Sequence, residues 1–105
     1  MNQNLQLRTL KLGKNIITKI QNLQMLTKLQ VLDLHSNKIK RIENLEYNRC
    51  LRSLNLANNL ITEIEGLETL TILTELILKY NMIEVVEGLE TCHGIKKLIV
   101  SHNCI

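Results

Sequence analysis

The stretch LDLHSNKIKRIENL, residues 32–45, places one asparagine in a row of apolar residues. On both sides of Asn37, apolar residues follow at two- and three-residue steps: Leu32, Leu34, Ile39, Ile42 and Leu45. A buried amide is costly unless both its oxygen and its nitrogen find hydrogen-bond partners. The fold must therefore bring unpaired backbone N–H and C=O groups to Asn37.

Asparagines recur every 22 residues along the chain, at Asn15, Asn37, Asn59, Asn81 and Asn103. Around each one the template L-x-x-L-x-L-x-x-N-x-I-x-x-I-x-x-L-x-x-L returns, starting at residues 7, 29, 51, 73 and 95. With Cys92 counted as apolar, only Asn48 breaks the template. A coiled coil would alternate steps of three and four, so the recurring two-residue steps predict a repeat of another kind.

Each copy of the repeat predicts one turn of a stacked coil. In the first copy the two-residue step from Leu10 to Leu12 puts both side chains on one side of a short strand, with Lys11 on the other. The later three-residue steps favour a short helix or tight helical turns on the back. One coil cannot bury its own apolar face, so the coils stack and each asparagine bonds the bends of its neighbours.

This pattern resembles the leucine-rich repeat family, and within it the class with 22-residue repeats. The stretches LGKNIITKIQNL, IENL and IEVVEGLE are similar to repeats of a regulatory subunit of protein phosphatase 1. Other members of the class are the leucine-rich light chain of axonemal dynein and a spliceosomal ribonucleoprotein subunit. The resemblance covers residues 7–105 and leaves residues 1–6 as a short lead-in.

The resemblance implies an α/β fold, a right-handed solenoid shaped as an arc. Its concave side would be a five-strand parallel sheet, and its convex side would carry short helical or 3-10 turns. In this family the concave face binds another protein and the repeats are not enzymes. The fifth copy stops in its turn at Ile105, so the sequence also has the features of a fragment of a longer repeat protein without independent function.

Composition narrows the cellular setting. The three cysteines, Cys50, Cys92 and Cys104, form no paired framework, and the first residues do not read as a secretory signal. No apolar run reaches the roughly 18 residues of a membrane helix. We expect an intracellular protein without membrane contact, in the cytoplasm, at a cilium or the cytoskeleton, or in the nucleus.

The outward strand positions form the candidate binding surface. Toward the C-terminal side, Ile77, Ile99 and Tyr80 fall together among charged residues, a composition typical of contact sites. The alternative is that single exposed isoleucines are ordinary. The predicted partner-binding residues on the concave face are Asp33, His35, Asn55, Ile77, Lys79, Tyr80, Lys97, Ile99 and His102.

Charge divides between the two halves of the repeat. The strand halves hold seven basic and two acidic residues, whereas the back halves hold six basic and eight acidic ones. A basic front favours a protein partner with an acidic surface, although both faces being merely solvated is an alternative. A nucleic-acid-associated subunit is a second alternative; it is disfavoured because Tyr80 is the only tyrosine, tryptophan or phenylalanine on this face.

No pattern in the sequence predicts catalysis, a cofactor or a metal. There is no glycine-rich phosphate loop and no nucleophile paired with a base. Cys92 and His93 fall on the back of the fourth coil, whereas His102 and Cys104 fall at the front turn of the fifth. We therefore expect these four not to converge on one ion.

Overall fold

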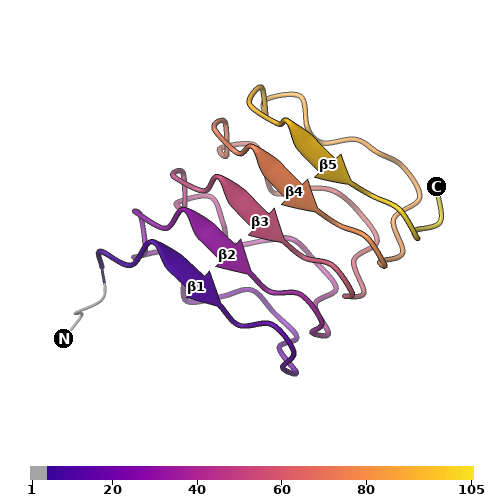
Figure 1. Cartoon of the computed structure of the whole chain (residues 1–105), viewed down its shortest axis with the longest axis horizontal. Helices are drawn as coiled ribbons and strands as arrows, with labels where there is room; N and C mark the ends of the chain where they lie inside the picture. Colours follow the sequence, from indigo (N-terminus) through magenta and orange to yellow (C-terminus); the bar gives the residue numbers. More distant parts are fainter. Residues whose placement is uncertain (1–4) are drawn as a thin grey trace.

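Five short parallel strands form one sheet along the front of the molecule. The computed structural model describes residues 5–105; residues 1–4, which belong to the predicted lead-in, lie outside the described residues. The strands lie side by side in the order of the sequence, so the first and the last strand form the two edges of the sheet (Figure 1). They are β1 (Thr9–Lys11), β2 (Val31–Asp33), β3 (Ser53–Asn55), β4 (Glu75–Ile77) and β5 (Lys97–Ile99).

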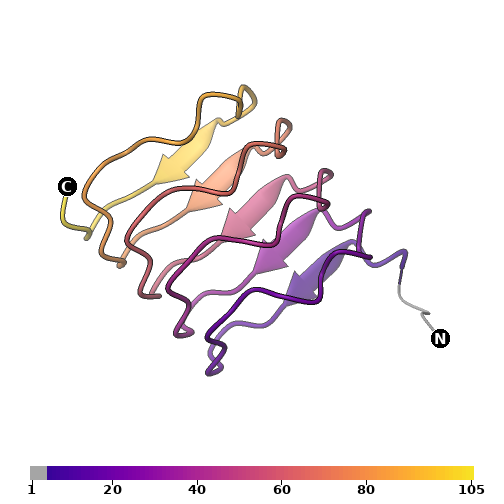
Figure 2. The ribbon, with the colours of Figure 1, turned by 180° about the vertical axis from the view of Figure 1, so that it is seen from behind.

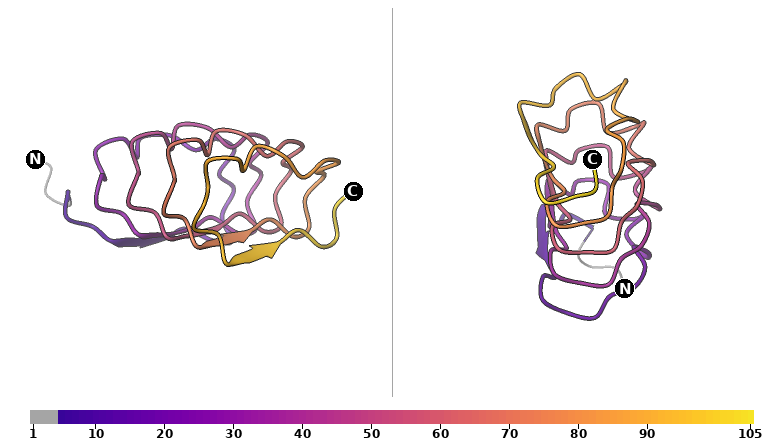
Figure 3. Two further views of the ribbon diagram at one scale, coloured as in Figure 1. Left: turned by 90° about the horizontal axis from the view of Figure 1, so that it is seen from above. Right: turned by 90° about the vertical axis from the view of Figure 1, so that its right-hand side faces the viewer.

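The register follows the 22-residue period. Leu10 pairs with Leu32, Leu32 with Leu54, and the same alignment continues through β5. The rest of each coil runs behind the sheet (Figure 2), so that each turn of chain encloses a row of leucines and isoleucines (Figure 3). Leu32, Leu54 and Leu76 are 0% exposed. The solenoid with its five-strand parallel sheet is confirmed.

The expected helices on the back of the coils are absent from the described residues. The back halves contain turns, such as those closed by the bonds from Leu26 N–H to Leu23 O (3.0 Å) and from Leu29 N–H to Leu26 O (3.2 Å). One residue in the middle of each complete back half has a positive φ: Asn22, Asn44, Gly66 and Gly88. A left-handed residue at that place interrupts any right-handed helix, so the expected short helices do not form there. The back halves hold single tight turns, each closed by a bond between residues three apart.

The left-handed backbone that recurs in each back half also explains the glycines at this position in the third and fourth coils. At Gly66 a Cβ would lie 2.6 Å from the carbonyl oxygen of Ile42 in the preceding coil, and at Gly88 it would overlap the carbonyl of Ile64. In the second coil Asn44 takes the same place, and its Nδ2 donates to Ile20 O at 2.7 Å. The close approach of backbones between coils therefore admits either a glycine or an amide that bonds the carbonyl it meets.

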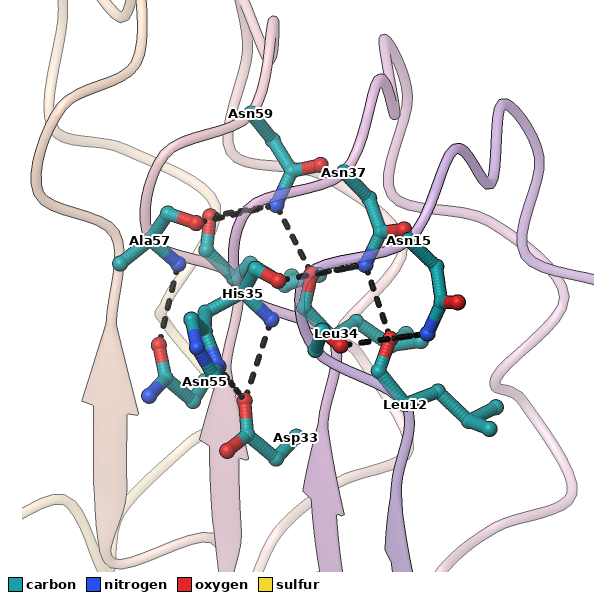
Figure 4. Close-up of polar contacts among 11 residues, drawn as sticks. Leu12, Asn15, Asp33, Leu34, His35, Asn37, Asn55, Ala57 and Asn59 are labelled. Atoms are coloured by element: carbon teal, nitrogen blue, oxygen red, sulfur yellow. Dashed lines mark hydrogen bonds and ion pairs between the residues drawn. The ribbon is translucent and has the colours of Figure 1, made fainter.

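The asparagines of the repeat bond the bends of adjacent coils. The N–H of Ile17 donates to Asn37 Oδ1 at 3.0 Å, and Asn37 Nδ2 donates to the carbonyls of Leu12 (3.1 Å) and Leu34 (2.9 Å). The same pattern holds at Asn59, Asn81 and Asn103. Asn15 begins the ladder and donates only to carbonyls of its own coil (Figure 4). Asn37 is only 5% exposed, so a polar side chain in the apolar row is accounted for by these bonds.

A second, shorter set of polar contacts lies on the opposite bend. Asn48, which breaks the leucine template, is fully buried, and its Nδ2 donates to the carbonyls of Leu23 (2.8 Å) and Leu26 (3.1 Å). In the fourth coil Cys92 occupies the same column, and its thiol donates to Leu67 O at 3.5 Å. The template marked these positions as apolar, but the bend again leaves carbonyls that need donors.

The fourth coil is less well covered than the template implied. Val86 occupies a core row of the repeat, yet it is 44% exposed. Leu89, Ile95, Leu98 and Val100 are likewise only partly buried.

We predict that Asn59→Leu lowers the free energy of unfolding by about 2 kcal/mol, because it leaves the buried N–H of Ile39 unpaired. The carbonyls of Leu34 and Leu56 lose one donor each but still accept from Asn37 and Asn81. The control is Asn15→Leu, whose amide makes no bond to another coil and whose loss should cost less than about 1 kcal/mol. Urea unfolding followed by circular dichroism measures both. Equal losses in the two variants would contradict the role given to the bonds between coils.

Candidate protein-binding face

The front face consists of the outward side chains of the strands and of the turn that follows each strand. Its apolar centre is formed by Ile77 in β4 and Ile99 in β5, which are directly opposite each other in the parallel register and both half-buried. The equivalent positions of the first three coils hold polar side chains: Lys11, Asp33 and Asn55. The isoleucine pair is therefore confined to the C-terminal side of the face.

Tyr80 and His102 stack on each other beside the isoleucine pair. Their ring centroids are 4.2 Å apart and the ring planes differ by 2°. Both residues have a left-handed backbone, with φ of 60° and 59°, at a turn position that has the same conformation in every coil. Because the two Cα atoms are related by one coil step, the side chains leave the backbone in the same direction and the rings lie parallel.

His35 is held against its own coil by Asp33. The His35 Nδ1 and the Asp33 Oδ1 are 2.6 Å apart, and the backbone N–H of His35 donates to the same oxygen at 3.1 Å (Figure 4). The ring lies over Gly13 of the first coil, where a Cβ would overlap it. The sequence marked Asp33 and His35 as partner-binding residues, but their polar atoms already bind each other.

Asn55 repeats the Asp33 arrangement one coil later. Its Oδ1 accepts the backbone N–H of Ala57 at 3.0 Å, two residues further along the turn (Figure 4). A short side chain with an acceptor at this position therefore supports the bend after the strand. The predicted site residues thus divide into a group bonded within the chain, Asp33, His35 and Asn55, and a group at the C-terminal side.

A chain of polar contacts that the sequence did not reveal crosses the three C-terminal strands. Ser53 donates its hydroxyl to Glu75 Oε1 at 2.8 Å, and Lys97 Nζ lies 3.2 Å from Glu75 Oε2. These two hydrogen bonds, with the positive charge of Lys97, lower the pKa of Glu75 below 4.5, and desolvation opposes them only in part. The residues are one 22-residue period apart, which is the signal that could have found them.

The unpaired charges of the front face are positive. Both of its carboxylates have partners: Asp33 has His35, and Glu75 has Ser53 and Lys97. Among the described residues, three exposed cations of this face have no ion pair, Lys11 and Lys14 in the first coil and Lys79 in the fourth. Three further exposed cations without an ion pair, Arg8, Arg52 and Lys96, immediately precede strands. The front face therefore carries unpaired positive charge at both ends of the sheet.

The described part of the chain shows neither a metal-binding group nor a membrane-spanning helix. Within residues 5–105, no three His, Cys, Asp or Glu side chains are grouped so that they could hold an ion. No helix of sufficient length and hydropathy to cross a bilayer occurs in the same range.

Two family models match the sequence over most of its first three coils. A model described as two copies of the leucine-rich repeat matches residues 5–47, and a model of the single leucine-rich repeat matches residues 50–70. The chain belongs to the leucine-rich repeat family. No curated protein gives a significant match to this leucine-rich repeat sequence.

Solved structures show the same coil. An internalin (InlF) from Listeria monocytogenes has a TM-score of 0.85 and 31% identity over 91% of this chain, and internalin C2 of the same bacterium has 0.88 and 31% over 93%. This leucine-rich repeat chain spans 28% and 43% of the lengths of those two proteins. A chain of the LRIM1/APL1C complex shares the fold, with a TM-score of 0.52 and 19% identity over 91% of this chain.

We predict that Glu75 stabilises the fold only above acidic pH. Its pKa is lower in the folded chain than the ordinary value of 4.5, so its contribution is fully present above that value and is lost as the pH falls through the lowered pKa. Urea unfolding of wild type and Glu75→Gln between about pH 3 and 6 should show a difference that shrinks at the acidic end. The control Glu90→Gln removes an exposed back-face carboxylate; a constant difference for Glu75→Gln across the range would contradict the prediction.

Proposed function

We propose that this leucine-rich repeat chain is an intracellular protein-interaction module, a scaffold or regulatory subunit, that binds an acidic protein surface through its front face. The observation that supports this most directly is the apolar pair Ile77 and Ile99, with the Tyr80–His102 stack on the same two coils. Lys79 adds a cation without an ion pair there. A desolvated apolar and aromatic centre with a charged rim is the usual composition of a protein contact.

The ion pair of Glu75 supports an acidic partner. Since Glu75 is paired with Lys97, it does not offset the cations that face solvent. An acidic surface would gain attraction from Lys79 on this face and from Lys96 next to it. We expect Lys79, Lys97, Tyr80 and His102 to contribute at the C-terminal side, with Asp33, His35 and Asn55 shaping the face.

Support for a protein partner also comes from the family. Leucine-rich repeat chains of the same fold take part in the LRIM1/APL1C complex, and the internalins share 31% of their aligned residues with this chain. The front sheet is one continuous surface in the stack (Figure 1), so a partner would contact several coils at once.

The test is affinity capture with a matched pair of variants. Ile77→Glu/Ile99→Glu places two carboxylates in the apolar centre and should abolish capture of front-face partners. Ile72→Glu makes the same chemical change at a residue outside that centre that is 42% exposed, and should leave capture unchanged. Circular dichroism must show that all chains are folded. Recovery of the same proteins by wild type and by the double variant would refute the proposed surface.

A nucleic-acid-associated role is the second candidate, and the excess of unpaired cations on the front face favours it. Against it, the Tyr80 and His102 rings stack on each other, so their facing surfaces are not available to bases. A mobility-shift assay with RNA over a range of salt separates the two candidates. Tight binding that weakens steeply with salt would favour nucleic acid over an acidic protein.

A further inference from the structure

The back of the solenoid separates its charges along the stack. All six lysines and arginines of the back halves lie in the first two coils, within residues 15–50. The back halves of the third and fourth coils, residues 59–72 and 81–94, contain no lysine or arginine and carry six glutamates: Glu63, Glu65, Glu68, Glu84, Glu87 and Glu90. The backbone of these two segments lies behind the sheet, in the coils that begin with β3 and β4 (Figure 2).

Few of these glutamates are neutralised by the chain itself. Glu65 lies 3.3 Å from Arg41 of the second coil, and the other five make no ion pair within the described residues. Their field reaches the core, because Glu68 and Glu90 add to the effect of burial in raising the pKa of the Cys92 thiol. The back of the third and fourth coils therefore presents a negative surface.

A hollow of about 290 Å³ with a mostly polar and acidic lining opens between the third and fourth coils on this surface. It is lined by the apolar side chains of Met82 and Val85, and by Thr62, Glu63, Glu84 and Glu87. The two coils are held side by side there, since the N–H of Met82 donates to Ile61 O at 2.8 Å. Met82 is 42% exposed and Val85 is 56% exposed.

Folding does not require apolar residues at these two positions. The column of Met82 holds Lys38 in the second coil and Ile16, Leu60 and Cys104 in the others. The column of Val85 holds Lys19, Arg41 and Glu63 in the first three coils. Both columns therefore point outward and accept charged side chains. Exposed apolar side chains that the core does not need, grouped around a hollow, mark a contact surface.

We propose that this hollow binds a basic amphipathic segment of a protein partner. The aliphatic part of a lysine or arginine, or a neighbouring leucine, covers Met82 and Val85, and the cationic group lies near Glu63, Glu84 and Glu87. This partner is opposite in charge to the one proposed for the front face. The chain would then hold two different proteins, one on each side of its coils.

The experiment uses the whole chain and a defined probe. Isotope-labelled chain is titrated with a short amphipathic peptide of lysine and leucine, and amide shifts are followed by NMR. The expected result is saturable shifts at residues 62–63 and 82–87. A peptide of lysine and glycine, which has the same charge without apolar side chains, should bind at least about tenfold more weakly, a difference of about 1.4 kcal/mol.

Matched variants separate this site from general attraction and from the front face. Met82→Ser/Val85→Ser should weaken binding of the lysine–leucine peptide about tenfold, whereas Ile16→Ser, at the Met82 column of the first coil and 83% exposed, should not. Ile77→Glu/Ile99→Glu should leave this peptide bound, so failure of either proposed surface is seen separately.

Three results would overturn the proposal. The first is equal binding of the two peptides, which would show attraction of counter-charge alone. The second is shifts spread over all six back glutamates or over the strands. The third is self-association of the chain in sedimentation velocity that is lost when Lys38 and Lys40 are changed to glutamate. The occupant of the hollow would then be a second copy of this chain.

Discussion

The structure depends on satisfying the backbone at one bend of every coil. A chain that turns back on itself after three strand residues leaves N–H and C=O groups pointing into the stack, where water does not reach them. Asn37, Asn59 and Asn81 meet both kinds of group from two successive coils at once. This bonding fixes the spacing of the bends, and the spacing fixes which leucines meet inside and which side chains share a column outside.

The sheet could be predicted from the sequence because every element of it repeats with one period. A 22-residue step identifies the strands, their parallel register and the row of buried asparagines without knowledge of any side-chain conformation. The back could not be predicted in the same way, because three-residue apolar steps fit a helix and a series of turns equally. The left-handed backbone of Asn22 and Asn44 favours the series of turns over the helix. An asparagine in the sequence is not enough to predict that backbone conformation.

For the candidate site, the sequence predicted which residues occupy equivalent positions in successive coils. It did not predict which side chains bond to one another. The period correctly placed Ile77 opposite Ile99. It did not show that Asp33 and Asn55 use their acceptors on their own turns, nor that Glu75 links Ser53 to Lys97. These hydrogen bonds depend on the side-chain rotamers and on which of several nearby donors each acceptor binds. The same limit explains Asn48, whose buried amide is misread if leucine is the only residue expected in its column.

The repeat allows the front and the back of the solenoid to carry opposite charge. Strand positions and back positions alternate along one chain, so a change of charge on one side leaves the other untouched. In the third and fourth coils the strand halves hold Arg52, Lys79 and Glu75, whereas the back halves hold six glutamates and no lysine or arginine.

The different bonding of Asn15 and the later asparagines has a consequence for local unfolding. Asn15 bonds only its own turn, whereas Asn59 is tied to the coil before it and bonds its own bend as well. Coils touch only their nearest neighbours, so a coil that is hydrogen-bonded to a coil on each side should open later than one that is bonded on a single side. We therefore expect the slowest amide exchange in the coils of Asn37, Asn59 and Asn81, which are bonded on both sides.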